Sequence, residues 1–355
     1  MMLLNILKNL DQTKFEFILF SLQNGELKNE LPTSIKFYSD KSTSSISKRI
    51  QNKLRKKLGY TSLLEKQILK LNNEFKPDIW YLNTLILADI VEIAIKNKVK
   101  YAVHFHELLS QYNYVSYSVL NKTISNSSFT VGCCNAVCEN LKTLGSKRVF
   151  KQFECIDDTS IIVNSERQEQ IKIETNIPKD FQVIVMSGQR IDRKGYDLFI
   201  EIAQKLKNEK LFFIWLGGSK NSGFEFFMDK YIDQFQIKNL RVIHPQKSDY
   251  YNYLNCADIF FLSSREDPFP LVMLEANYLG KYIVALNSGG AVEFLDTNKG
   301  HIINSWNIDD IARELKICCT NVKEKIIHPV FKTENYFAKP QTLLFESILQ
   351  NSLSK

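Results

Sequence analysis

The sequence predicts an α/β protein of two doubly wound domains, in which helices cover both faces of parallel sheets. Its 355 residues are 44% hydrophobic, which supplies enough apolar chain for two cores. Short, continuous apolar segments recur along the chain and are typical of strands buried on both faces. Amphipathic patterns of helical period separate most of these segments, as in parallel sheets whose strands are joined by helices.

The apolar segments define the strands. In chain order, the predicted strands are 15–22, 78–83, 100–106, 129–134, 182–188, 211–218, 241–245, 258–264 and 282–288. The clearest helical patterns are 196–208 and 270–280. Because doubly wound sheets bind ligands outside the carboxyl ends of their strands, the residues that follow each strand are the candidates for chemistry.

One polar stretch interrupts the alternation and suggests a division of the chain. Residues 157–180 contain no strong strand, and we place a domain linker there. Two domains are therefore predicted, at residues 1–160 and 161–335. Residues 336–355 have the pattern of an amphipathic helix interrupted near Pro340, and we expect it to pack back on the N-terminal domain.

The charge and cysteine content limit the functional classes. A net charge of +7 suits acidic partners such as phosphates, nucleotides or an anionic membrane surface. It falls short of a nucleic-acid signature unless the charge is clustered, and we expect no nucleic-acid partner. The 7 cysteines show no metal-ligand spacing and are predicted to be reduced. Since the charged start does not resemble a secretory leader and no apolar run approaches membrane-spanning length, we expect a cytoplasmic protein.

Basic and small residues follow the strand at 182–188. Gly188 permits a tight turn, and Arg190, Arg193 and Lys194 precede the helix at 196–208. Cations beside a helix N-terminus form a natural site for a pair of phosphates, because free N–H groups and the helix dipole both favour anions. The alternative is a basic, solvated loop.

Two glycines follow the strand at 282–288. Gly289 and Gly290 remove side chains at a point where the backbone can approach a ligand, and a helix start follows them. A double glycine is also common in an ordinary turn, which is the alternative interpretation.

The stretch "SREDPFPLVMLE" follows the strand at 258–264 and carries three carboxylates, Glu266, Asp267 and Glu275. Asp267 and Glu275 are placed to border one cleft, where carboxylates would accept hydrogen bonds from paired sugar hydroxyls. The alternative is an acidic N-terminal helix cap with an incidental glutamate.

Two histidines lie at the end of the strand at 100–106. We expect His104 and His106 to point to opposite faces, with His106 at the strand end beside the cleft. A histidine there can donate a hydrogen bond or carry a proton at neutral pH, and the alternative is a purely structural residue.

Together these pieces resemble family 4 glycosyltransferases, which have the GT-B fold of two facing Rossmann-like domains. The resemblance is carried by "SGQRIDRKGYDLFIEIA", "CADIFFLSSREDPFPLVMLEANYLGKYIVALNSGGAVEF", "IWYLNT" and "VHFHEL". It implies a retaining transferase that moves a hexose-type sugar from a nucleotide-diphosphate sugar to a glycan or lipid-linked acceptor in surface polysaccharide synthesis. The N-terminal domain would face the acceptor, and the C-terminal domain would bind the donor.

The resemblance also implies roles for individual residues. Asp267 takes the first position of the family's acidic-x7-acidic element, usually Glu, and would bind the donor sugar; Glu266 lies one residue out of register. Glu275 takes the second position and would bind the ribose. His106 would sit beside the transferred sugar.

The donor diphosphate is assigned to the basic loop and the glycines. Lys194 would contact it with Arg193, and Arg190 is the alternative cation. Gly188 would shape the turn, while Gly289 and Gly290 would let backbone amides meet the donor. The resemblance implies no metal and no cofactor besides the donor, because cations and helix N-termini can stabilise the leaving diphosphate.

The N-terminus departs from the family. Met1 falls inside the expected first helix, so the usual first strand and its glycine-rich loop are expected to be missing from these residues. Either the true start lies upstream of Met1, or the chain is truncated. The missing strand and loop keep a non-catalytic, nucleotide-sugar-binding or scaffold relative as an alternative function, with a sugar-nucleotide epimerase on the same fold as another.

The segment 41–70 is rich in Lys and Arg, and apolar residues recur in it every four positions. It predicts a basic amphipathic helix, which suits peripheral docking on the anionic inner face of a membrane. The alternative is a helix packed on its sheet with a solvated cationic face.

Overall fold

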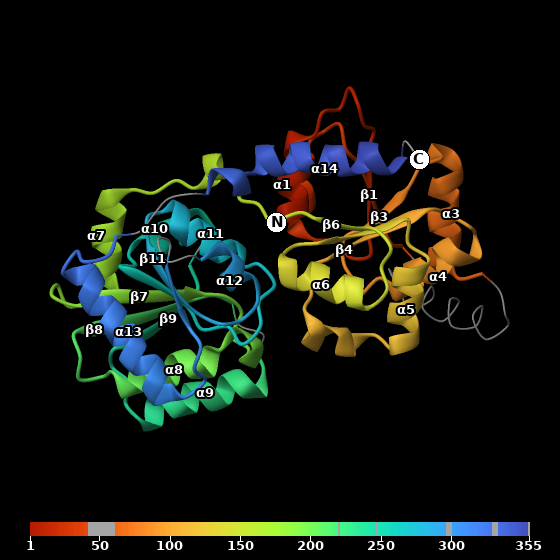
Figure 1. Ribbon diagram of the computed structural model, residues 1–355. Helices are drawn as coiled ribbons and strands as arrows, with labels where there is room; N and C mark the ends of the chain where they lie inside the picture. The colour runs from red at the N-terminus through yellow and green to blue at the C-terminus, as the bar shows by residue number, and fades with distance from the viewer. Residues whose placement is uncertain (42–60, 219–220, 246, 296–299, 329–332, 354–355) are drawn as a thin grey trace. The chain divides into compact units, whose positions relative to one another are not determined.

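The protein is described from a computed structural model that covers residues 1–41, 61–218, 221–245, 247–295, 300–328 and 333–353 (Figure 1). The chain divides into two compact units. Unit 1 comprises Met1–Cys133, Val137–Gln152 and Ala338–Lys355, and unit 2 comprises Cys134–Ala136 and Phe153–Phe337. The chain therefore crosses between the units after Gln152 and after Phe337, whereas the sequence placed these boundaries at 160 and 335.

Unit 1 contains two parallel sheets with helices packed around them. The first sheet pairs β1 (Ile18–Ser21) with β2 (Lys36–Ser39). The second has the order β3-β4-β5-β6, with strands Trp80–Leu82, Tyr101–Phe105, Phe129–Gly132 and Val149–Lys151. The helices are α1 (Met2–Asn9), α3 (Leu63–Phe75), α4 (Ala88–Lys96), α5 (Tyr117–Ser125), α6 (Asn135–Thr143) and α14 (Ala338–Leu353).

Strand β1 of the first sheet and strand β3 of the second sheet are only partly buried. Every residue of β1 has intermediate exposure, whereas every residue of β4 and β5 is buried. Within the described residues β1 pairs only with β2, and β3 pairs only with β4. The predicted N-terminal helix is present as α1, and no described strand joins β1 to β3.

Helix α14 closes unit 1 by packing on the chain's first residues (Figure 1). The buried Phe345 ring lies 6.1 Å from Phe17 and 5.0 Å from Tyr81, measured between centroids. Glu346, also buried, accepts a hydrogen bond from the Asp11 amide at 2.8 Å. Pro340 does not interrupt this helix, because it lies in the first turn, where its missing N–H would have had no helical partner.

Unit 2 is built on a six-stranded parallel sheet of order β12-β11-β10-β7-β8-β9. Its strands, in chain order from β7 to β12, are Gln182–Ser187, Leu211–Leu216, Leu240–Ile243, Ile259–Leu262, Tyr282–Leu286 and Gly300–Ile303. Its helices, in chain order from α7 to α13, are Ser165–Glu174, Tyr196–Lys205, Gly223–Gln234, Tyr250–Asn255, Leu271–Tyr278, Gly290–Phe294 and Ile308–Lys323. The chain turns one way from β7 and the other way from β10, so the strand order reverses between these two neighbours.

The polar stretch 157–180 is not a linker. It contains α7, which packs on α10 inside unit 2 and has one buried residue, Ile171. The helix is polar because the rest of its surface is solvated, which explains why the sequence pattern resembled a linker. The segments that leave unit 1 instead run side by side at 156 and 337, where the Ile156 amide donates to the Tyr336 carbonyl at 3.0 Å.

Three observed strands were not predicted, β2, β6 and β12. Each is short and partly exposed, so it lacks the continuous apolar run of a central strand. Most of the predicted basic segment at 41–70 lies outside the described residues, at 42–60; its remainder includes the start of α3. None of the described helices combines the length and the apolar character needed to cross a bilayer.

Phe345→Ala is expected to destabilise unit 1 by about 3–5 kcal/mol, because it leaves a cavity between α14 and the two rings it contacts. Leu343→Ala, on the same helix but 58% exposed, should change stability by less than about 0.5 kcal/mol. Native-state hydrogen exchange of the β3 and β7 amides would measure the two units separately. Equal effects of both substitutions on the β3 amides would show that α14 does not close the core of unit 1.

Candidate functional site

The candidate site in unit 2 lies at the carboxyl edge of the sheet, where β7, β10 and β11 end. The loop after β10 is hydrogen-bonded to the loops on both sides of it. The Arg265 amide donates to the Arg193 carbonyl at 2.9 Å, and the Asp267 amide donates to the Ser288 carbonyl at 2.7 Å. The Gly290 amide then donates back to the Asp267 carbonyl at 3.1 Å. Three predicted strand-end loops are thereby fixed to one another at the point where strand order reverses.

Glycine is required at two positions in these loops because backbones approach closely. Gly195 has φ of +69°, and a Cβ added there would lie 1.9 Å from the Ser263 carbonyl oxygen. A Cβ on Gly290 would lie 1.8 Å from the Pro268 carbonyl oxygen. Gly289, with φ of +114°, also needs glycine for its backbone conformation. These glycines bring the loops together, so the double glycine already has a structural reason that is independent of a ligand.

Lys194 and Asp267 form the central ion pair of the site. The Lys194 Nζ donates to Asp267 Oδ2 at 2.5 Å, and the Ser264 hydroxyl donates to the same oxygen at 3.3 Å. Asp267 is buried, with only 5% of its surface exposed, while Lys194 is partly exposed. Lys194 follows β7 and Asp267 follows β10, and the structure joins their side chains by a direct hydrogen bond.

Glu275 lies on α11 and receives two tyrosine hydroxyls from α10. The Tyr251 hydroxyl donates to Oε1 at 3.2 Å, and the Tyr250 hydroxyl donates to Oε2 at 3.4 Å. Burial raises the pKa of Glu275 to about 7, although the two tyrosine hydrogen bonds act in the opposite direction. The carboxyl group is therefore close to the midpoint of its titration at neutral pH.

Of the other predicted donor-site residues, Arg193 and Glu266 contact each other, whereas Arg190 faces α9. Arg193 Nη1 donates to the Glu266 carbonyl at 2.9 Å, so these two residues join the loops after β7 and β10 through a main-chain contact. Arg190 is buried away from Lys194: its guanidinium pairs with Glu225 at 3.4 Å and Asp229 at 3.0 Å, both on α9. Gly188 is partly exposed after β7, with room for a Cβ.

The candidate site in unit 1 surrounds His106, which directly follows β4. The expectation that His104 and His106 point to opposite faces is wrong, because residues two apart on a strand share a face, and their rings lie 4.0 Å apart. His104 is fully buried and contacts the Tyr81 hydroxyl through Nδ1 at 2.8 Å. Burial, together with the neighbouring His106, lowers the pKa of His104 well below its usual value, so it stays neutral.

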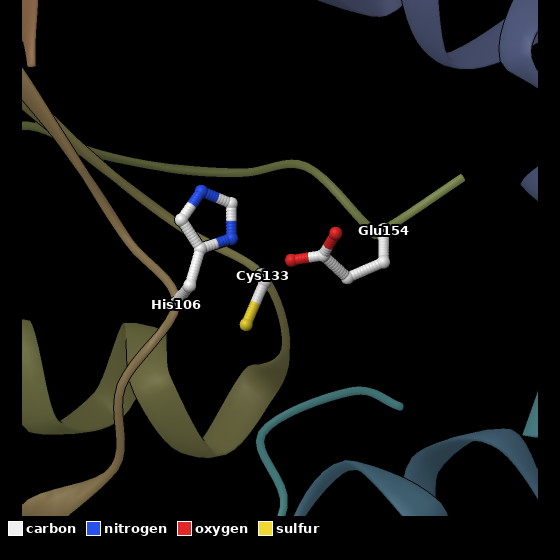
Figure 2. A group of neighbouring side chains, drawn as sticks. All are labelled: His106, Cys133 and Glu154. Atoms are coloured by element: carbon white, nitrogen blue, oxygen red, sulfur yellow. The ribbon is translucent and has the colours of Figure 1, made fainter. Parts of the chain in front are cut away.

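His106 itself is held by groups from two strand ends. Its Nε2 lies 3.2 Å from Asn83 Oδ1, after β3, and its amide donates to Glu107 Oε2 at 2.8 Å. Figure 2 shows His106 together with Cys133, which directly follows β5. Glu154, the third side chain in that view, belongs to unit 2 and is not included in this site.

Sequence reasoning missed several residues that complete these clusters. Tyr250 and Tyr251 lie on a helix with no charge or glycine signal, so only the fold brings them to Glu275. Asn83 follows β3, in the "YLN" segment, and the rule that selected the other strand ends would also have selected it.

Comparisons with known proteins show similarity to glycosyltransferases. Residues 167–325 match the family model described as "Glycosyl transferases group 1". The chain is 25% identical over 201 residues to N,N'-diacetylbacillosaminyl-diphospho-undecaprenol alpha-1,3-N-acetylgalactosaminyltransferase of Campylobacter jejuni, covering 54% of this chain and 51% of that protein. It is 24% identical over 186 residues to the lipopolysaccharide core biosynthesis glycosyltransferase LpsE of Rhizobium meliloti, covering 52% of each. The chain thus spans about half the length of these curated relatives.

The fold is matched over nearly the whole chain. The Anabaena protein Alr3699/HepE, solved in complex with UDP and glucose, superimposes with a TM-score of 0.77 at 13% identity, covering 98% of this chain and 95% of that one. The predicted GT-B fold is confirmed, and so is the resemblance to glycosyltransferases at the level of group 1. Membership of family 4 in particular stays a prediction.

Gly290→Ala is expected to destabilise unit 2 by about 1–3 kcal/mol, because its Cβ would overlap the Pro268 carbonyl oxygen and force the two loops apart. Gly188→Ala is the matched control: its Cβ would come no closer than 3.5 Å to the Lys194 side chain, so stability should change by less than about 0.5 kcal/mol. Hydrogen exchange of the β10 and β11 amides would measure both. A Gly290→Ala protein as stable as the wild type would refute the close contact between the loops.

Proposed function

We propose that this chain, which is similar to group 1 glycosyltransferases over residues 167–325, is a retaining glycosyltransferase with a nucleotide-diphosphate sugar as donor. It would transfer a hexose-type sugar to a glycan or lipid-linked acceptor. The observation that carries the proposal is the Lys194–Asp267 pair at the carboxyl edge of the unit 2 sheet, with Glu275 at the same edge. A cation and two carboxylates suit the three chemical parts of such a donor: the diphosphate, the sugar and the ribose.

Lys194 is the residue proposed to bind the diphosphate. It lies in the one-turn helix Asp192–Lys194, directly before Gly195 and the start of α8, where backbone N–H groups and the helix dipole also favour an anion. A nucleoside diphosphate leaves readily once its negative charge is stabilised, and a fixed cation does so without a metal. We therefore propose that no metal is needed.

Arg193 is the second proposed diphosphate contact, and Arg190 is not proposed for this role. The guanidinium of Arg190 is enclosed by the carboxylates of α9, and moving it to a ligand would leave the buried Glu225 without that cation. Among the residues that the structure describes, the Arg193 guanidinium would give up one hydrogen bond, to the Glu266 carbonyl.

Asp267 is proposed to accept hydrogen bonds from the donor sugar. Its Oδ2 already contacts Lys194 and Ser264, and a carboxylate has further lone pairs on its second oxygen. His106, held by Asn83 and Glu107, is the residue of unit 1 proposed to contact the transferred sugar.

The acceptor is proposed to bind unit 1. From Leu108 to Asn121, after β4, the chain carries no charged residue, and Leu109, Tyr114 and Tyr117 are strongly exposed there. Exposed tyrosines offer flat apolar faces with a polar tip, which suit sugar rings and the membrane interface. Because the Campylobacter relative is named for an undecaprenol-linked acceptor, a lipid-linked acceptor at the inner membrane face is the proposed case.

Lys194→Ala is expected to weaken nucleoside diphosphate binding by about ten- to a hundredfold, because a charge-assisted contact to the diphosphate is lost. Lys205→Ala, which removes an exposed lysine at the far end of α8, should leave the affinity unchanged. Isothermal titration with UDP, GDP and dTDP would measure affinity, and hydrolysis of the corresponding donor sugars would measure turnover. Unchanged affinity in Lys194→Ala would refute the diphosphate assignment, and nucleotide binding without any turnover would favour a non-catalytic relative.

A further inference from the structure

We infer that Tyr250 and Tyr251 are positioning residues that hold the Glu275 carboxylate ready to accept the two vicinal hydroxyls of the donor ribose. This inference rests on the proposed function, because it concerns the same donor site. It assigns a role to two side chains that belong to none of the predicted motifs.

The geometry shows two hydroxyls converging on one carboxyl group. Tyr250 and Tyr251 are consecutive at the start of α10, and consecutive helix residues normally point about 100° apart. Their hydroxyls nevertheless reach opposite oxygens of Glu275, at 3.4 and 3.2 Å, and their rings meet edge to face at 5.2 Å. Contacts on both oxygens fix the rotation of the carboxyl plane, which a single contact would leave open.

A third contact anchors the pair to the sheet. The Tyr250 hydroxyl lies 2.8 Å from the Ser187 hydroxyl, at the carboxyl end of β7. A phenol has one proton, and an ionised carboxylate only accepts. The Tyr250 hydroxyl therefore lies between two acceptors, Ser187 Oγ at 2.8 Å and Glu275 Oε2 at 3.4 Å, and its position is set from the central strand outward.

The arrangement leaves room for a diol. A carboxylate offers about four lone-pair positions, and the two tyrosines occupy one on each oxygen. One position on each oxygen then remains, which matches the two adjacent hydroxyls of a ribose. Glu275 as a whole residue is partly exposed.

The charge state of Glu275 links this geometry to pH. Burial raises the pKa of Glu275 to about 7, and the tyrosine hydrogen bonds oppose that rise. The groups that face the carboxyl are the two phenols from α10, and Asp157 and Ser160 from the preceding segment face Tyr251. Because hydroxyl donors need the ionised form, ligand affinity should level off above about pH 8 and fall as the pH drops through about 7. Removing a phenol hydroxyl raises the pKa of Glu275 further, so the fall should begin at a higher pH.

The test combines conservative variants with a matched pair of ligands. Tyr250→Phe and Tyr251→Phe keep the rings and remove only the hydroxyls, and Tyr253→Phe, on the same helix without a contact to Glu275, is the control. The probe is UDP or GDP, whichever binds the wild type more tightly, with its 2'-deoxy form for comparison. Affinities would be measured by isothermal titration between pH 6 and 9.

Each of the two variants should bind the ribonucleotide about five- to tenfold more weakly than the wild type at pH 7, with a smaller loss for the 2'-deoxy form. Their affinity should begin to fall at a higher pH, while Tyr253→Phe should match the wild type. Equal losses for both ligands with an unshifted pH profile would mean general loosening of the fold and would overturn the inference, as would unchanged binding.

The two proposals fail in different ways. A wild-type protein that binds none of UDP, GDP and dTDP at any pH would overturn the proposed function and this inference with it, whereas binding of dTDP alone would overturn only the inference. Wild-type binding that is the same in Tyr250→Phe, Tyr251→Phe and Tyr253→Phe would overturn the inference alone.

Discussion

The candidate donor site depends on the hydrogen bonds that fix the loop after β10 to the loops after β7 and β11. Two backbone bonds, from Arg265 to Arg193 and from Asp267 to Ser288, require the chains to approach within van der Waals distance. Glycine at 195 and at 290 is the residue that permits this approach. Without these contacts Asp267 would lie on a free loop, and its pairing with Lys194 would have to be built from two flexible partners. The rigid placement of the charged pair therefore follows from backbone geometry rather than from the charges themselves.

The fold, and the meeting of three strand-end loops at one edge of the sheet, could be predicted from the sequence because both follow from local pattern and topology. Continuous apolar strands separated by amphipathic helices leave parallel sheets as the simplest solution, and parallel strands bring their carboxyl ends to one edge. Lys194, Asp267 and Gly290 lie on three different loops, yet adjacent strand ends bring them together. Short edge strands such as β2 escaped notice because they are partly exposed and lack a full apolar run.

The rest of the site depends on side-chain directions that the sequence does not encode locally. Arg190 has the right charge in the right loop, but its guanidinium faces the carboxylates of α9, a partner that only the packing of helices reveals. The expectation that His104 and His106 point to opposite faces is wrong, because residues two apart on a strand share a face and the two rings lie 4.0 Å apart. In the sequence, Tyr250 and Tyr251 look like ordinary residues of a helix. Only the fold shows that their hydroxyls form hydrogen bonds with Glu275.

Position 267 carries an aspartate, which is one methylene shorter than the glutamate usual at the first position of the acidic-x7-acidic element, and this difference has a direct physical consequence. Aspartate brings its carboxylate to Lys194 at 2.5 Å while its own amide stays bonded to Ser288, so the backbone and the ion pair satisfy one another. Glu266 instead offers its carbonyl to Arg193, which binds the same loop from the side of β7. A buried carboxylate beside a lysine is stable only while the pair stays together, and a diphosphate that draws Lys194 toward itself would weaken that pairing. Sugar hydroxyls that donate to Asp267 would then replace part of the hydrogen bonding that the carboxylate loses when Lys194 moves away. The diphosphate and the sugar of the donor would therefore each favour the binding of the other.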